Sequence, residues 1–245
     1  MAQQAEEHLT TERAIEFARK HKKRIAKRVA DKNLYPPEDD PVSVFMAGSP
    51  GAGKTEASKE LIAVLSENGQ GVLRIDPDEL REEFDDYRGG NAWLFQPAVS
   101  ILVEKLLDVV LKQRQSFLLD GTFANYAKAR DNVARSLDKS RLVQILYVYQ
   151  DPLLAWEFVA AREALEGRRI PMESFVEQYF AARGVTNRIK QEFGKSVMVD
   201  LLIKNHDGSH GEYVQNVEQI DTHIAEGYAR QPLLQKLAEK TRKPI

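Results

Sequence analysis

The sequence predicts an α/β fold, a three-layer sandwich in which helices cover both faces of a mostly parallel, five-stranded sheet. Short runs rich in Val, Ile, Leu and Tyr alternate along the chain with helical segments of about 10–20 residues. Parallel strands need connections of this length, and right-handed crossovers place the connecting helices on both faces of the sheet. Helical extensions are expected at both ends of the chain.

Composition sets broad limits on the class of protein. The chain has 245 residues, of which 42% are hydrophobic, and a formal net charge of −2 from 35 Lys+Arg against 37 Asp+Glu. Global disorder is therefore excluded. Because nucleic-acid coating needs a basic footprint, we do not expect nucleic acid as a partner. The absence of Cys excludes a disulfide scaffold and thiolate chemistry.

The N-terminal sequence lacks the pattern of a signal peptide. Met1–Thr10 is polar and carries Glu6 and Glu7 where an apolar segment would lie. No run approaches the ~20 apolar residues that a membrane-spanning helix needs. We therefore expect a soluble, cytoplasmic protein without a membrane segment.

Three parts follow one another along the chain. Residues 1–40 predict an N-terminal helix over 9–32, with seven Lys/Arg between Arg19 and Arg28, followed by a linker rich in proline and acidic residues. Residues 41–205 carry the alternating strands and helices. Residues 206–245 predict a C-terminal helical extension.

The elements of the middle part follow from hydrophobic periodicity and from helix-start residues. Strands are expected at 42–47, 72–75, 117–120, 142–149 and 197–203. Helices are expected at 56–65, 77–84, 92–113, 125–137, 152–165 and 172–193. Pro77 and Pro152 suit the first position of a helix, where the missing N–H has no partner anyway.

A phosphate-binding loop follows the first strand. The motif G-x-x-x-x-G-K-[ST] is matched without a mismatch by Gly48, Ser49, Pro50, Gly51, Ala52, Gly53, Lys54 and Thr55. Glycines let successive N–H groups point inward at phosphate oxygens, and the following helix adds its N-terminal dipole. Lys54 is expected to reach the β- and γ-phosphates, and the Thr55 hydroxyl to ligate Mg²⁺. The motif predicts a P-loop NTPase-like or kinase-like fold that binds ATP with Mg²⁺.

Polar residues follow the second and third strands. Asp76 and Asp78 come just after the second strand, and Asp120 and Thr122 just after the third. In open α/β sheets these carboxyl ends line the ligand site. Asp120 suits a second Mg²⁺ ligand or its water shell, and Asp76 or Asp78 suits the acceptance of a hydroxyl proton.

Arginines further along could hold a phosphoryl group. Arg162, Arg168 and Arg169 offer guanidinium groups for the group in transfer. Each candidate also has a structural alternative: Asp76 and Asp78 as helix caps, Asp120 as a turn residue, and the arginines as a solvated face. A kinase fits these parts better than a GTPase, because no N/TKxD guanine motif is present.

The ordered set of motifs resembles the zeta toxin family over about residues 42–205. The resemblance rests on the phosphate loop, on I-D-P-D-E-L-R at 75–81, on D-G-T at 120–122, on Arg162 and on G-R-R-I-P at 167–171. It implies an ATP-dependent kinase that phosphorylates the 3′-hydroxyl of the amino sugar in UDP-N-acetylglucosamine.

The resemblance also implies roles for particular residues. Asp78 is the implied base that takes the hydroxyl proton, Arg162 and Arg168 lie on the γ-phosphate, and Glu104 and Thr122 contact the substrate. From spacing alone, Glu104 would face solvent. Two departures stand out: Asp120 replaces the family's usual Glu, and residues 82–87 lack its common His-Pro.

Two partners are implied by the family. One is an antitoxin protein, because family members are blocked at the nucleotide site by a helical antitoxin. The other is the chain itself, since residues 1–35 could dock on the kinase core and inhibit it in cis. Alternative functions are a P-loop kinase of another acceptor (a nucleoside, a polynucleotide 5′-end or a small metabolite) and a nucleotide-dependent binding module without catalysis.

Overall fold

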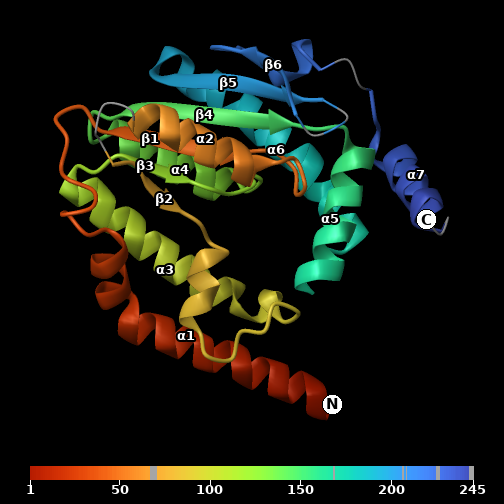
Figure 1. Cartoon of the computed structure of the whole chain (residues 1–245), viewed down its shortest axis with the longest axis horizontal. Helices are drawn as coiled ribbons and strands as arrows, with labels where there is room; N and C mark the ends of the chain where they lie inside the picture. The colour runs from red at the N-terminus through yellow and green to blue at the C-terminus, as the bar shows by residue number, and fades with distance from the viewer. Residues whose placement is uncertain (67–70, 168, 206, 208, 225–226, 243–245) are drawn as a thin grey trace.

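The computed structural model describes residues 1–66, 71–167, 169–205, 207, 209–224 and 227–242, and it confirms the α/β sandwich (Figure 1). One sheet contains six strands in the order β2-β3-β1-β4-β5-β6. Their bounds are β1 Val42–Ala47, β2 Leu73–Ile75, β3 Phe117–Leu119, β4 Leu142–Tyr149, β5 Val197–Lys204 and β6 His210–Val214. The first five strands run parallel. All five therefore point their carboxyl ends to one edge.

The sixth strand differs from the sequence prediction, which expected five strands and a wholly helical C-terminal extension. β6 pairs antiparallel with β5, with Leu201 opposite Val214 and Leu202 opposite Tyr213. The connecting turn is closed by the Asn205 N–H, which donates to the Ser209 carbonyl at 2.8 Å. A short edge strand that contains a glycine has little hydrophobic pattern to reveal it, and this explains the miss.

The helices lie close to their expected positions. Their bounds are α1 Ala2–Val29, α2 Lys54–Ser66, α3 Ala92–Gln113, α4 Tyr126–Leu137, α5 Pro152–Glu166, α6 Met172–Phe193 and α7 Arg230–Arg242. Short 3₁₀ helices cover Glu79–Glu83 (η1), Gly194–Ser196 (η2) and Ile220–Thr222 (η3). Among the described residues, no helix is long and apolar enough to cross a membrane.

Alternate residues of the strands face two different helical layers. Val44 and Met46 of β1 pack with Ala57 of α2 on one face. Phe45 and Ala47 point the other way, into a larger cluster formed with α1, α3, α4 and α6. This period of two residues is the strand geometry expected for a sheet buried on both faces. The sandwich therefore has α2 as one outer layer and α1, α3, α4 and α6 as the other.

Helix α1 is packed on the kinase-like core rather than separated from it. Ala18 and Ile25 are buried in the cluster that includes α3, and α1 runs along α3, apart from α2 (Figure 1). The Phe17 and Phe84 rings lie 5.4 Å apart, and Arg28 forms an ion pair with Glu83 at the end of η1. The N-terminal helix thus supports η1, which directly follows Asp78.

Candidate active site

The phosphate loop spans the gap between the end of β1 and the start of α2. Gly51 has φ +72°, and a Cβ atom there would lie 2.1 Å from the carbonyl oxygen of Ala155 in α5. Because L residues rarely adopt this φ and no side chain fits the space, the position requires glycine. The Gly48 N–H donates to the Thr122 carbonyl at 3.2 Å, which joins the loop to the segment after β3.

Lys54 lies at the centre of this loop. Its Nζ donates to the carbonyls of Gly48 at 3.1 Å and Ser49 at 2.6 Å. Desolvation lowers the pKa of Lys54 to about 8, although the nearby carboxylates of Asp120 and Asp78 act in the opposite direction. Arg162 adds to the lowering. The charged side chains of Asp78, Asp120 and Arg162 therefore lie within electrostatic range of Lys54.

Thr55 and Asp120 lie beside the first turn of α2. The Ser58 hydroxyl lies 2.9 Å from the Thr55 carbonyl oxygen and 3.2 Å from the Asp120 carboxylate, and its one proton can be donated to either. Asp120 is only 7% exposed. The described residues include no cluster of three His, Cys, Asp or Glu side chains that could hold a metal alone. Mg²⁺ is usually bound by few protein oxygens together with substrate phosphates and water, so one hydroxyl and one carboxylate fit this ion.

The two carboxylates after β2 have different surroundings. Asp76 Oδ1 accepts from the Asp78 N–H at 2.8 Å, so Asp76 caps the turn that opens η1. Asp78 makes no side-chain cap. Its carboxylate instead forms an ion pair with Arg81, and its other oxygen lies 3.7 Å from Arg162 Nη2. The capping alternative is therefore correct for Asp76, and Asp78 is the acid that faces Arg81 and Arg162.

The candidate arginines are not equivalent. Arg162 extends from α5 toward Asp78 and is 46% exposed. Arg169 is 77% exposed, and its Nε lies 3.9 Å from Glu163. Arg168 lies outside the described residues. Arg162 is thus the described arginine of this group that reaches the cluster around Lys54.

A groove of about 180 Å³ opens beside Asp120 at the carboxyl ends of β1 and β3. Its lining includes Gln96, Glu104, Thr122 and Asn132. Glu104 is 48% exposed, as spacing predicted, and it pairs with Arg135 at 3.2 Å. The buried Asn132 Oδ1 has no hydrogen-bond donor among the described residues. The groove therefore has apolar walls, several polar side chains and one buried oxygen, Asn132 Oδ1, without a donor among the described residues.

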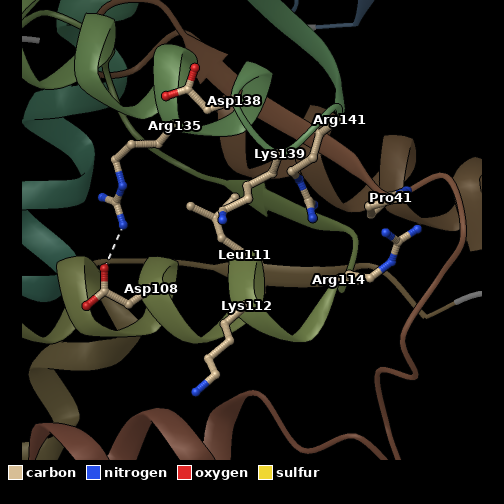
Figure 2. Close-up of a pocket in the computed structure, with 9 residues that line it drawn as sticks. All are labelled: Pro41, Asp108, Leu111, Lys112, Arg114, Arg135, Asp138, Lys139 and Arg141. Carbon is tan, nitrogen blue, oxygen red and sulfur yellow. Dashed lines mark hydrogen bonds and ion pairs between the residues drawn. The ribbon is translucent and has the colours of Figure 1, made fainter.

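A larger hollow, of about 670 Å³, lies near the amino ends of the strands (Figure 2). Its basic side chains are largely engaged in holding the fold. Arg135 pairs with Asp108 at 2.6 Å, and Arg141 donates to Ser43 and to two backbone carbonyls. This hollow contains none of the phosphate-loop residues, so we place the candidate site at the opposite edge of the sheet.

Two residues of the site were given no role from the sequence. Arg81 is 7% exposed and links Asp78 to Gln96 Oε1, the latter at 2.7 Å. Arg74, near the end of β2, contacts both Asp76 and Asp120. An arginine three residues after a candidate base was a usable signal for Arg81. Arg74 lies between two apolar residues of a strand, and no motif marks it as a site residue.

Solved structures of known proteins share this fold. A structure from the PezAT chromosomal toxin–antitoxin system of Streptococcus pneumoniae matches with a TM-score of 0.61 and 13% identity over 91% of this chain and 93% of that chain. The AvrRxo1-ORF1:AvrRxo1-ORF2 structure with sulphate ions matches with a TM-score of 0.62 and 16% identity over 84% and 71%. The same complex with ATP gives a TM-score of 0.56 and 16% identity over 84% and 65%.

The zeta toxin family model matches residues 25–218. This range begins within α1 and ends after β6, so it includes the phosphate loop, both strand-end acids and α5. It also extends beyond the residues 42–205 over which the motifs show the resemblance. The chain, with its kinase-like P-loop fold, therefore belongs to the zeta toxin family.

Proposed function

We propose that this protein is an ATP-dependent kinase that transfers the γ-phosphate to a sugar hydroxyl, with Asp78 as the general base. The acceptor proposed from the family is the 3′-hydroxyl of the amino sugar in UDP-N-acetylglucosamine. One observation carries this proposal. Asp76 caps the turn that opens η1, whereas the Asp78 side chain makes no cap hydrogen bond, and the Asp78 carboxylate lies beside Arg162, in electrostatic range of Lys54.

The phosphate loop would hold ATP, as the AvrRxo1 structure with ATP supports for a protein of similar fold. Backbone N–H groups of Gly51, Gly53 and Lys54 would bind the β-phosphate region, and Lys54 Nζ would leave the carbonyls of Gly48 and Ser49 for phosphate oxygens. Thr55 and Asp120 would hold Mg²⁺. Bound there, this ion would neutralise charge on the phosphate oxygens.

Asp78 would accept the proton of the attacking hydroxyl. Transfer forms the bond between the hydroxyl oxygen and the γ-phosphorus, breaks the bond from that phosphorus to the β–γ bridging oxygen, and leaves ADP. Arg162 would stabilise the charge on the phosphoryl group in transfer, which is the largest electrostatic demand of such reactions. Arg81 would hold the Asp78 carboxylate in its orientation through their ion pair. Arg168 stays a prediction for the second arginine.

The groove beside Asp120 supports a sugar as the acceptor group. Its volume of about 180 Å³ is below the ~300–1,000 Å³ of pockets that enclose whole ligands, so it would receive one ring of a larger molecule. Thr122 and Glu104 offer acceptors for hydroxyl and amide protons. We propose Glu104 and Thr122 as substrate-binding residues on this basis.

An antitoxin partner is supported by the PezAT structure of similar fold, which comes from a toxin–antitoxin system. The contacts of α1 bear on the proposal of self-inhibition by residues 1–35. α1 contacts α3 and η1 and lies apart from α2 (Figure 1). Control in cis would therefore act through η1 and Asp78, rather than by covering the phosphate loop.

The test is phosphate transfer from ATP and Mg²⁺ to a panel of UDP-sugars, nucleosides and oligonucleotides. We expect labelled UDP-N-acetylglucosamine, and a raised KM for this acceptor in Glu104→Gln. Glu82→Gln, outside the groove, serves as the matched control. Labelling of a nucleoside or an oligonucleotide instead would establish a P-loop kinase of another acceptor. ATP binding without transfer to any acceptor would favour a binding module.

A further inference from the structure

The Arg74 side chain contacts four other residues of the candidate site. Its side chain is 13% exposed, and Nη2 lies 2.6 Å from Asp76 Oδ2 and 2.6 Å from Asp120 Oδ2. Nη1 lies 2.6 Å from Glu79 Oε1, and Nε donates to Ser58 Oγ at 3.1 Å. One guanidinium thus joins β2, the segment before η1, the end of β3 and the first turns of α2.

The two carboxylates that share Nη2 would otherwise repel each other. Asp120 is 7% exposed and Asp76 13% exposed by side chain. Two poorly solvated like charges need a cation between them to keep one geometry. A planar guanidinium can donate to several oxygens in fixed directions, whereas an ammonium group is a single point charge. The site therefore depends on arginine at this position.

The first branch of this network leads to the proposed base. Arg74 holds Asp76 through Oδ2, while Asp76 Oδ1 accepts from the backbone N–H of Asp78 at 2.8 Å. The position of the Asp78 main chain is thereby fixed from β2. Its side chain is left to Arg81 and Arg162.

The second branch leads to the proposed metal side. Arg74 and Ser58 both donate to Asp120 Oδ2. These two donors orient the carboxylate through its Oδ2. Among the described residues, no donor contacts its Oδ1. This is the arrangement by which outer residues orient a metal-binding carboxylate.

We propose that Arg74 is a positioning residue that aligns Asp78 and Asp120 with each other. The proposal rests on the proposed kinase function for its Asp78 branch only. It predicts that the base and the metal-side carboxylate lose their alignment together when Arg74 is replaced.

The experiment compares Arg74→Lys and Arg74→Met with Arg141→Lys and Arg141→Met. Arg141 is a matched control, because it is a buried arginine with several hydrogen bonds at the other edge of the sheet. The readouts are kcat, the KM for ATP, the thermal melting temperature, and the Mg²⁺ dependence of binding of a fluorescent ATP analogue. The binding readout needs no acceptor and no turnover.

We expect Arg74→Met to raise the half-saturating Mg²⁺ concentration and to lower kcat by roughly 10–100-fold, as outer residues of metal sites do. Arg74→Lys should fall between wild type and Arg74→Met. The KM for ATP at saturating Mg²⁺ should not change, because the phosphate loop is intact. The Arg141 variants should change the melting temperature alone.

Wild-type kcat and wild-type Mg²⁺ dependence in a folded Arg74→Met protein would overturn the proposal. If Arg74→Met does not fold, the comparison of Arg74→Lys with Arg141→Lys decides in the same way. The Asp78 branch has its own check in single-turnover transfer. In the wild type, Arg74→Lys should slow transfer through both branches. In Asp78→Asn it should slow transfer by a smaller factor, because only the Asp120 branch is left to lose, and equal factors in the two backgrounds would overturn the Asp78 branch.

The experiments separate a failure of the kinase proposal from a failure of the proposal for Arg74. If the wild type transfers phosphate to no acceptor, the kinase proposal fails. The Mg²⁺ dependence of nucleotide binding in Arg74→Met still decides whether Arg74 positions Asp120.

Discussion

Arg162 Nη2 lies 3.7 Å from Asp78 Oδ2, although the two residues come from α5 and from the segment after β2. This contact joins the two sides of the candidate site at the carboxyl edge of the sheet. A proposed base and a proposed phosphoryl-binding cation thus meet where a transferring group would pass.

Asp78→Asn should lower kcat by roughly 10²–10⁴-fold, because the amide cannot take the hydroxyl proton. ATP affinity should stay near that of the wild type, since the phosphate loop is untouched. Steady-state kinetics and nucleotide titration measure the two quantities. Asp85→Asn is the control, as an exposed acid in the same segment. Equal kcat values for the wild type and Asp78→Asn would remove Asp78 from the mechanism.

Arg162→Ala should lower kcat by roughly 10²–10³-fold, the usual effect of deleting one group that stabilises transition-state charge. The KM for the acceptor should change little, because the arginine acts on the phosphoryl group. Arg130→Ala removes an exposed arginine of α4 that pairs with Glu192 of α6 and should be silent. A loss confined to the acceptor KM would assign Arg162 to acceptor binding instead.

ATP affinity should fall as pH rises through about 8, the pKa to which desolvation lowers Lys54 in the free protein. ATP affinity falls because Lys54 is neutral above this pKa and attracts phosphate less. Bound phosphate in turn favours the protonated form of Lys54. Calorimetry in buffers of different ionisation enthalpy should show proton uptake on binding above pH 8. Lys54→Arg keeps its charge and should lack this uptake. Identical pH profiles for both proteins would contradict the assignment.

Gly51→Ala should abolish nucleotide binding, because a Cβ atom there would lie 2.1 Å from the Ala155 carbonyl oxygen. The loop and α5 cannot both keep their positions. Gly184→Ala is the matched control, since no atom lies within 4 Å of a Cβ atom at this position of α6. That change should raise stability by about 0.5–1 kcal/mol through helix propensity. Retained ATP binding in Gly51→Ala would mean that the loop tolerates a different backbone.

Ile25→Ala should lower the free energy of unfolding by about 2–5 kcal/mol, the range for large-to-small changes in a core. Ile25 is 3% exposed and packs in the cluster shared with α3. Leu9→Ala, at a 54% exposed position on the same helix, should be nearly neutral. Chemical denaturation compares the two. Equal stabilities would mean that α1 is not packed on the core in solution.

The sequence predicts most of the helices and strands where periodicity and chain-breaking residues act locally. The bounds of α3, β4 and α6 match their expected ranges, because each has a long apolar pattern with clear ends. β6 was missed because edge strands with one covered face carry a weak pattern.

The site was predictable as a set of residues but not as a set of contacts. Asp76 and Asp78 both precede η1, so their spacing left the cap and the base interchangeable, and the choice of Asp78 came from the resemblance to the zeta toxin family. Only the hydrogen bond from the Asp78 N–H to Asp76 separates them. The Arg74–Asp120 pair joins residues far apart in the chain, and no local signal predicts such a contact. Packing between β2 and β3 creates it.

The most direct test of the central claim is the site of phosphate attachment on UDP-N-acetylglucosamine after incubation with ATP and Mg²⁺. Phosphorus–proton correlation NMR of the purified product measures it. We predict one new phosphate on the 3′-oxygen of the amino sugar with the wild type, and none with Asp78→Asn. An unmodified sugar nucleotide, or equal phosphorylation by the two proteins, would contradict the claim.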